Sequence, residues 1–173
     1  MSLRTIIVAL PPDDIQRGIE ILANLYKQRF GDPCRSSLPV HITIIQPFSG
    51  EIIPSTLAAI HNQAFPEGPI TVTCTGYGTF SQKKCTIFGE CESPDLGQTR
   101  RQLIAMLPPD IRKDIDHVFK PHITIARRVA HVTLEKAMVL LEHHDKLHCT
   151  FTVDRLSVYQ QKSPRDPWQP FSQ

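Results

Sequence analysis

One short sequence occurs twice in this chain, and it constrains the fold more than any other feature. The tetrapeptide His-Ile-Thr-Ile occupies residues 41–44 and, 81 residues later, residues 122–125. The same shift aligns three further pairs of segments: residues 5–7 with 86–88, 14–15 with 95–96, and 70–72 with 151–153. Apolar strands resemble one another by chance, but chance does not easily keep one register through several segments. The sequence therefore predicts an internal duplication. Because two copies are too few for a solenoid, we expect two βαβαβ lobes related by a pseudo-two-fold axis.

Strand and helix signals follow the same order in both repeats, which we place at about residues 1–81 and 82–162. β-Branched or alternating segments predict strands at residues 5–10, 40–46, 70–77, 86–91, 121–126 and 149–159, the last being one strand or a bent pair. Helices are expected from Asp13 or Asp14 as cap to Gly31, at residues 55–65, from the cap Ser93 to Pro108, and at residues 133–143. No low-complexity linker separates the repeats. We therefore expect a single bilobed domain over residues 1–162 and an extended tail at residues 163–173.

Composition and charge are those of an ordinary globular protein. Of the 173 residues, 40% are hydrophobic and 21% are charged, and the formal net charge is +2. This charge permits an anionic substrate, but it is not the marked basic excess of a general nucleic-acid binder. No apolar run approaches the roughly 18–20 residues that span a bilayer, and the N-terminus has no secretory signal, so we expect a cytoplasmic protein without membrane contact. The five cysteines include no C-x-x-C pair, which predicts free thiols.

The repeated motif brings together side chains that suit chemistry on a phosphodiester. Side chains two residues apart on a strand share a face, so His41 lies beside Thr43 and His122 beside Thr124. An imidazole titrates near neutrality, so one copy can accept a proton while the other donates one. The two hydroxyls can donate hydrogen bonds to phosphate oxygens, where negative charge gathers in the transition state. Threonine is a poor zinc ligand and no third ligand recurs at suitable spacing, so we expect neither a metal nor another cofactor.

A single His-x-Thr strand would favour a structural role, because threonine is common in strands and one strand histidine is more often structural than catalytic. Two identical copies in register favour a catalytic role instead.

Longer segments around the motifs resemble a known family. The second motif reads Pro-His-Ile-Thr-Ile-Ala-Arg at residues 121–127, the first strand reads Arg-Thr-Ile-Ile-Val-Ala-Leu-Pro at residues 4–11, and Gln-Pro-Phe follows the first motif at residues 46–48. Over about residues 4–160 the chain resembles the two-histidine phosphoesterase superfamily. Within it, the chain is most similar to the LigT-like 2′-5′ RNA ligases and RNA 2′,3′-cyclic phosphodiesterases.

The resemblance implies a bilobed α+β fold in which two antiparallel sheets face each other across a central groove. It implies hydrolysis of 2′,3′-cyclic phosphate ends, usually to a 2′-phosphate, and reversible 2′-5′ ligation in some members. The family histidines fall on His41 and His122, and its hydroxyl positions fall on Thr43 and Thr124. Which histidine is the acid and which the base stays open.

One family arginine follows the second motif and falls on Arg127. Strict strand alternation from His122 would instead turn Arg128 toward the catalytic face, and a bulge would reverse this, so both are candidate phosphate contacts. The two halves also differ, since Val40 stands where the second copy has Pro121, and Gln46 where it has Arg127.

Aromatic and basic residues near the motifs are weaker candidates for substrate contact. Phe48 and Tyr159 are the leading candidates to stack on a base, with Phe119 and Trp168 as further ones, although core packing or tail docking is the simpler role for all four. Lys83-Lys84 and the histidines at residues 143, 144 and 148 are expected to be solvated surface groups.

The expected partners are RNA ends or nucleotides that bear a cyclic phosphate, bound by a monomer without an obligate protein partner. An enzyme for a small molecule, such as ADP-ribose 1″,2″-cyclic phosphate, is an alternative with the same residues. A non-catalytic module that binds RNA ends or nucleotides is another, although such a module would not need two proton-transfer groups.

Overall fold

A computed structural model describes residues 3–50, 68–81, 83–113, 118–144 and 147–171, together with the single residues 56, 59, 65 and 115. Within these residues the strands are β1 (Arg4–Ala9), β2 (Ile42–Ser49), β3 (Ile70–Phe80), β4 (Cys85–Glu92), β5 (His122–Val129), β6 (His148–Val153), β7 (Leu156–Gln161) and β8 (Gln169–Pro170). The helices are α1 (Asp13–Phe30), α3 (Pro94–Met106), α4 (Pro109–Arg112) and α5 (His131–Glu142). Apart from single residues, the helix expected at residues 55–65 falls outside the described residues.

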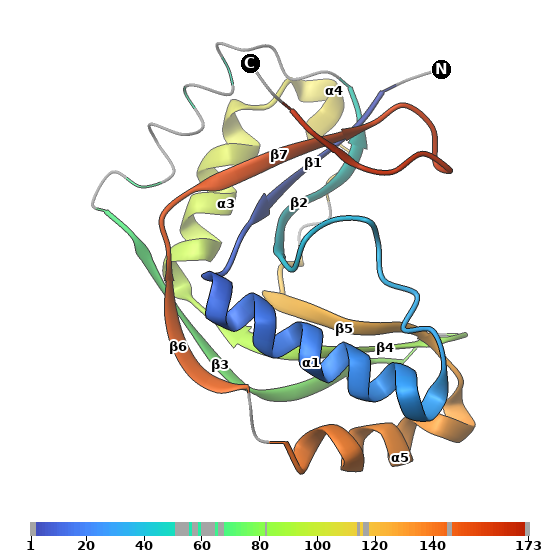
Figure 1. Cartoon of the computed structure of the whole chain (residues 1–173). Coiled ribbons are helices and arrows are strands. Elements are labelled where there is room, and N and C mark those ends of the chain that lie inside the picture. The colour runs from blue at the N-terminus through green and yellow to red at the C-terminus, as the bar shows by residue number, and fades with distance from the viewer. Residues whose placement is uncertain are drawn as a thin grey trace.

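The strands form one antiparallel sheet in the order β6-β3-β4-β5-β2-β1-β7-β8, which bends into two halves (Figure 1). Strands β2, β1, β7 and β8 make one half, and β5, β4, β3 and β6 make the other. At the centre the halves are joined by a single residue pair between β2 and β5, Ile42 with Ile123. At the outer edge, β6 leads directly into β7, which belongs to the other half. This mixed α/β fold with two antiparallel half-sheets confirms the predicted fold class.

Strand registers are consistent with the predicted duplication. Ile42 pairs with Ile123 between β2 and β5, and Thr71 pairs with Thr152 between β3 and β6. Each pair joins residues that the 81-residue shift makes equivalent, as a two-fold axis through both pairs requires. In the second repeat, the bent pair β6–β7 is the equivalent of the long strand β3. Strand β3 pairs with β6 and β4, and the pair β6–β7 correspondingly pairs with β3 and β1. Each half-sheet therefore contains strands from both repeats, in contrast to one self-contained lobe per repeat.

Helix ends follow the local sequence with one correction. The N-cap of α1 is Pro12 and no side chain caps this end, so neither Asp13 nor Asp14 is the cap. Both aspartates lie in the first turn, where their charge interacts favourably with the helix dipole. The helix ends at Gly31, whose φ of 95° suits a residue without a Cβ. Ser93 caps α3 as predicted, because its Oγ accepts a hydrogen bond from the Leu96 N–H at 3.3 Å.

Both motif strands run further than expected. We predicted the first one at residues 40–46, but β2 continues through Pro47 to Ser49. The register with β1 slips between Thr5 and Ile7, opposite the segment that contains Pro47, so an irregular ladder accommodates a residue without an N–H. The second strand, β5, continues beyond Ala126 to Val129.

The C-terminal tail lies on the β7 edge of the sheet. Residues Gln169–Pro170 form β8 and pair with β7. Before it, Trp168 packs on a small apolar cluster of Ile6, Val8 and Leu38, separate from the main core. None of the described helices has the length and apolar character that a membrane span requires.

Candidate active site

Both motif histidines stand at the start of the two central strands and are held in the same way. His41 immediately precedes β2, and its Nδ1 lies 2.7 Å from the carbonyl oxygen of Pro39. His122 opens β5, and its Nδ1 lies 2.7 Å from the carbonyl oxygen of Lys120. A carbonyl oxygen only accepts hydrogen bonds, so each Nδ1 carries a proton and donates it. The other ring nitrogen, Nε2, is thus left for proton transfer. It can accept a proton when the imidazole is neutral and donate one when the imidazole is protonated.

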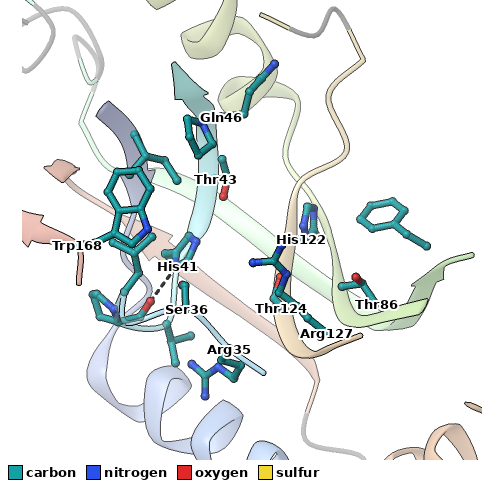
Figure 2. Close-up of a pocket in the computed structure, with 16 residues that line it drawn as sticks. Arg35, Ser36, His41, Thr43, Gln46, Thr86, His122, Thr124, Arg127 and Trp168 are labelled. Atoms are coloured by element: carbon teal, nitrogen blue, oxygen red, sulfur yellow. Dashed lines mark hydrogen bonds between the residues drawn. The ribbon is translucent and has the colours of Figure 1, made fainter. Parts of the chain in front are cut away.

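A pocket of about 380 Å³ opens between the two half-sheets and contains both motifs (Figure 2). Its wall includes His41 and Thr43 from the β2 side and His122 and Thr124 from β5, and the two imidazoles stand on opposite sides of it. The remaining lining residues are Ile6, Arg35, Ser36, Leu38, Pro39, Val40, Gln46, Pro47, Phe80, Thr86, Arg127 and Trp168. The structure therefore brings together all four residues that the motifs single out.

Electrostatics favours the neutral form of both imidazoles. Burial lowers the pKa of His41, the hydrogen bond to Pro39 opposes this, and the positive charges of Arg35, His122 and Arg127 lower it further. Burial also lowers the pKa of His122, the hydrogen bond to the Lys120 carbonyl opposes it, and the Lys120 ammonium adds to it. That ammonium forms an ion pair with Glu90 at 2.6 Å. A bound phosphate anion would raise both pKa values, because an opposite charge favours the protonated form.

Two aromatic rings pack against His122. The ring centroids of Phe80 and Phe88 each lie 5.0 Å from that of the imidazole. Gly78 makes room for Phe88, since a Cβ at this position would lie 2.5 Å from a carbon of the Phe88 ring. His41 has no such aromatic support among the described ring contacts and instead faces the loop that contains Arg35.

A bulge in β5 decides between the two arginines. Ile87 of β4 pairs with Ala126, but Cys85 pairs with Val129, so the β5 strand carries an extra residue between these pairs. Arg128 takes a left-handed conformation there, with φ of 57°. As a result Arg127 lines the pocket, whereas Arg128 lines a neighbouring one.

Most of the aromatic candidates lie away from the pocket. Phe48 is 5% exposed and belongs to the main core, and Tyr159 packs on the cluster beneath Trp168. Phe119 lies under the guanidinium of Arg100, at 5.1 Å from its carbon. Neither Phe48 nor Tyr159 is part of the wall of this pocket, so the structure does not place them beside the motif residues. Trp168 is the candidate that lines it.

Lys83 and Lys84 are exposed in the β3–β4 connection, and His143 and His148 are exposed at the ends of α5 and β6. Nowhere in the described part of the chain do three His, Cys, Asp or Glu side chains gather as a metal-ligand set.

Sequence reasoning did not single out several polar residues of the wall. Gln46 is the repeat equivalent of Arg127, and the duplication itself was a signal for it. Thr86 is the repeat equivalent of Thr5. The two differ in environment, because Thr86 lines the pocket whereas Thr5 is buried and its hydroxyl donates a hydrogen bond to the Gly50 carbonyl oxygen at 2.7 Å. Arg35 and Ser36 come from the loop after α1, which carries no motif and gave no signal. Arg35 is held there by an ion pair with Glu20 at 2.8 Å.

The fold and the paired His-Thr motifs around one pocket are those of the LigT-like group of the two-histidine phosphoesterase superfamily. Residues 11–165 match the model of the 2′-5′ RNA ligase superfamily, and the chain belongs to that family. No curated protein matches the chain.

Solved structures share its fold at low sequence identity. The protein TT0787 of Thermus thermophilus has 19% identity and a TM-score of 0.70, with 98% of this chain and 95% of that chain covered. E. coli LigT in apo form has 16% identity and a TM-score of 0.62, with 99% and 95% covered. Usb1 of Kluyveromyces marxianus has 10% identity and a TM-score of 0.54, with 98% of each chain covered.

Proposed function

We propose that this protein is a cyclic phosphodiesterase that hydrolyses the 2′,3′-cyclic phosphate ends of RNA or nucleotides without a metal cofactor. One observation carries the proposal. Two His-Thr pairs line one pocket, and each imidazole holds Nδ1 on a backbone carbonyl and keeps Nε2 free for a substrate. A pure binding module would need neither the second proton-transfer group nor the matched orientation.

The proposed reaction uses one imidazole as general base and the other as general acid. The base Nε2 takes a proton from water as the water oxygen attacks phosphorus. The bond from phosphorus to the 3′ oxygen breaks, and the acid Nε2 protonates that oxygen. The product is a 2′-phosphate with a free 3′ hydroxyl, and the two imidazoles have exchanged protonation states, which solvent then resets. Ligation to a 2′-5′ linkage is the same step with the 5′ hydroxyl of a second strand in place of water: its oxygen attacks phosphorus, the base Nε2 takes its proton, and the 3′ oxygen again leaves and is protonated by the acid.

We assign the base to His41 and the acid to His122. Three positive groups, those of Arg35, His122 and Arg127, act on His41 and disfavour its protonated form. At His122 the contributing charge is Lys120, which is paired with Glu90. Burial is the largest cause that lowers the pKa of both imidazoles, and the larger number of positive charges around His41 is our reason for proposing it, rather than His122, as the base.

Thr43 and Thr124 are proposed to donate hydrogen bonds to the two non-bridging oxygens, and Arg127 to neutralise the charge that develops there. All three side chains line the pocket on the strands that carry the histidines. Phosphate-bearing ligands in a related fold support this proposal: E. coli LigT has been crystallised with 3′-AMP, with phosphate and with ATP.

The experiment is incubation with nucleoside 2′,3′-cyclic phosphates in the presence of EDTA, followed by product analysis. We expect turnover that survives chelation, a 2′-phosphate product, and loss of turnover in His41→Ala and His122→Ala. Tight binding without product would favour the non-catalytic module. Turnover confined to ADP-ribose 1″,2″-cyclic phosphate would favour the small-molecule enzyme. The monomeric state and the cytoplasmic location stay predictions.

A further inference from the structure

A second pocket adjoins the first and is rich in arginine. This arginine pocket, of about 600 Å³, is lined by Arg4, Cys34, Arg35, Ser36, Ser37, Pro47, Arg127, Arg128, Gln161, Pro164, Asp166 and Trp168. Its lining therefore contains four guanidinium groups and a single carboxylate, that of Asp166, although the net charge of the whole chain is only +2. Five of the lining residues, including Arg35, Arg127 and Trp168, also line the catalytic pocket. The two pockets are thus neighbours that share a wall.

The arginines of this pocket have few acidic partners. Arg35 is paired with Glu20, and Arg4 donates to the Gln161 side-chain oxygen at 3.1 Å. Arg127 and Arg128 are exposed, and no ion pair between described residues engages either of them. Arg128 also adopts a left-handed backbone conformation, which a non-glycine residue tolerates at a cost. This arrangement concentrates uncompensated positive charge at one place beside the proposed catalytic site.

Trp168 forms part of the wall that the two pockets share. Its backbone N–H donates to the Ser37 hydroxyl at 2.9 Å, which ties the tail to the loop before β2. Its ring packs on the apolar cluster of Ile6, Val8 and Leu38, and the Arg4 guanidinium carbon lies 5.7 Å from its centroid. Figure 2 shows the indole on the same side of the catalytic pocket as His41. An indole fixed in this way offers a flat surface on which a nucleobase can stack.

We infer that the arginine pocket binds a second phosphate of the substrate, the internucleotide phosphate on the 5′ side of the nucleotide that carries the cyclic phosphate. This inference rests on the proposed function of the adjoining site. Successive phosphates of an RNA strand are separated by a single ribose, so a site for the second one must adjoin the first. The shared wall meets this condition, and guanidinium groups are suited to binding phosphate oxygens in pairs. The substrate class is therefore an RNA end rather than an isolated nucleoside cyclic phosphate.

The test compares substrates that differ by the second phosphate. These are a nucleoside 2′,3′-cyclic phosphate, its 5′-phosphorylated form, and a dinucleotide with a terminal cyclic phosphate. We expect kcat/KM to rise roughly ten- to a hundredfold when either form of the second phosphate is present, the range for a hydrogen bond to a charged group. ADP-ribose 1″,2″-cyclic phosphate, which supplies a pyrophosphate, forms the fourth arm. A gain with this compound alone would overturn the inference.

Two variants address arginines that line only the arginine pocket. Arg4→Gln removes one charge, and Arg128→Asn removes another with a residue that accepts a left-handed backbone. Each is expected to reduce the preference for the 5′-phosphorylated substrate about tenfold, with Arg101→Gln on the exposed surface of α3 as the control. Equal losses on the substrates with and without the second phosphate would overturn the inference.

A binding readout separates this inference from the proposed function. Trp168 is the only tryptophan of the chain, so intrinsic fluorescence reports directly on the shared wall. Titration with a nucleoside cyclic phosphate, with and without its 5′-phosphate, should give tighter binding for the phosphorylated form, and Arg128→Asn should reduce this difference. If no substrate is turned over but this difference persists, the proposed function fails and the second phosphate site stands. If the two affinities are equal, the second site fails whatever the activity.

Discussion

The two halves of the pocket are built alike but surrounded differently. His41 and His122 share one orientation, with Nδ1 held by the carbonyl two residues earlier. Around His122 the neighbours are aromatic rings, whereas His41 faces a loop that carries Arg35 and a tail that carries Trp168. The repeated motif therefore places two equivalent imidazoles at one pocket, and their unequal neighbours distinguish the two.

The residue two positions after the end of each motif also differs between the two halves. Gln46 and Arg127 are equivalent in the repeat and both line the pocket. Both strands carry an extra residue at this point of their ladders. The Gln46 side-chain oxygen accepts a hydrogen bond from the buried Arg100 at 3.5 Å, whereas no ion pair between described residues engages Arg127. One half thus presents a neutral amide where the other presents a cation. The predictions below test how far the two halves are equivalent.

Removal of either histidine should give the largest effect. His41→Ala and His122→Ala are each expected to lower kcat on a 2′,3′-cyclic nucleotide by roughly 10²–10⁴-fold, because each removes one proton-transfer group. The double variant should be little worse than the single ones, since the two groups act in one step. Steady-state kinetics measures this, with the exposed His143→Ala as control. Losses that multiply in the double variant would contradict a shared step.

A substrate with a good leaving group distinguishes the two histidines. An aryl phosphodiester that releases nitrophenolate needs no protonation of its leaving group. His122→Ala should therefore retain most wild-type activity on it, while His41→Ala should not. The opposite pattern would reverse the assignment of acid and base and leave the reaction itself intact.

The two threonines are expected to give the next largest effect, and an equal one. Thr43→Val and Thr124→Val keep the side-chain shape and remove a hydrogen-bond donor, so kcat should fall by roughly 10²-fold in each. Thr152→Val, on the exposed face of β6, serves as control. A loss in only one of the two variants would show that the halves differ in their contacts to the phosphate as well.

The pair Gln46 and Arg127 tests the asymmetry itself. Arg127→Gln gives both halves the same residue and should lower kcat/KM by about tenfold, because a charged contact to the substrate phosphate is lost. Adding Gln46→Arg to this variant restores the charge on the other side of the pocket. We do not expect it to restore activity, because Gln46 accepts a hydrogen bond from the buried Arg100, and an arginine there would set a second guanidinium beside that one. Full recovery in the double variant would show that only the total charge matters. Initial rates at several substrate concentrations measure both.

The smallest expected effect is on the pH dependence of stability, and His41 and His122 should contribute to it in the same direction. Burial lowers the pKa of His41 and of His122 in the folded chain, so the unfolded chain binds more protons once the pH falls below about 6.5. The free energy of unfolding should therefore fall as the pH drops through that range, and level off below the lowered pKa values. His41→Gln and His122→Gln should each weaken this dependence in denaturant titrations at pH 5 and pH 7. An unchanged dependence in both variants would contradict the stated cause.

Much of the site could be predicted because it depends on local periodicity. Alternation along a strand puts His and Thr on one face, and an identical motif at a constant shift predicts two such faces. The core strands, the Ser93 cap and the Gly31 helix end follow from equally local rules. The fold class needed no more than this pattern and the family resemblance that it supports.

Other features depended on contacts that no local rule describes. The exchange of β3 and β7 between the half-sheets arises from long-range pairing, and the sequence is compatible with one lobe per repeat. The bulge that turns Arg127 rather than Arg128 into the pocket is set by the β4–β5 register. Phe48 was placed in the core by its neighbours across β1, and Trp168 was placed at the pocket by an apolar cluster from distant segments.

The sequence by itself determined which imidazoles and hydroxyls share a face of each motif strand, because side-chain identity and strand period are local properties. The tertiary structure decided what surrounds each group: the positive charges near each histidine, and the arginine pocket that adjoins the pocket of the two motifs. These depend on loops and tails whose positions are fixed only by packing against residues far away in the chain.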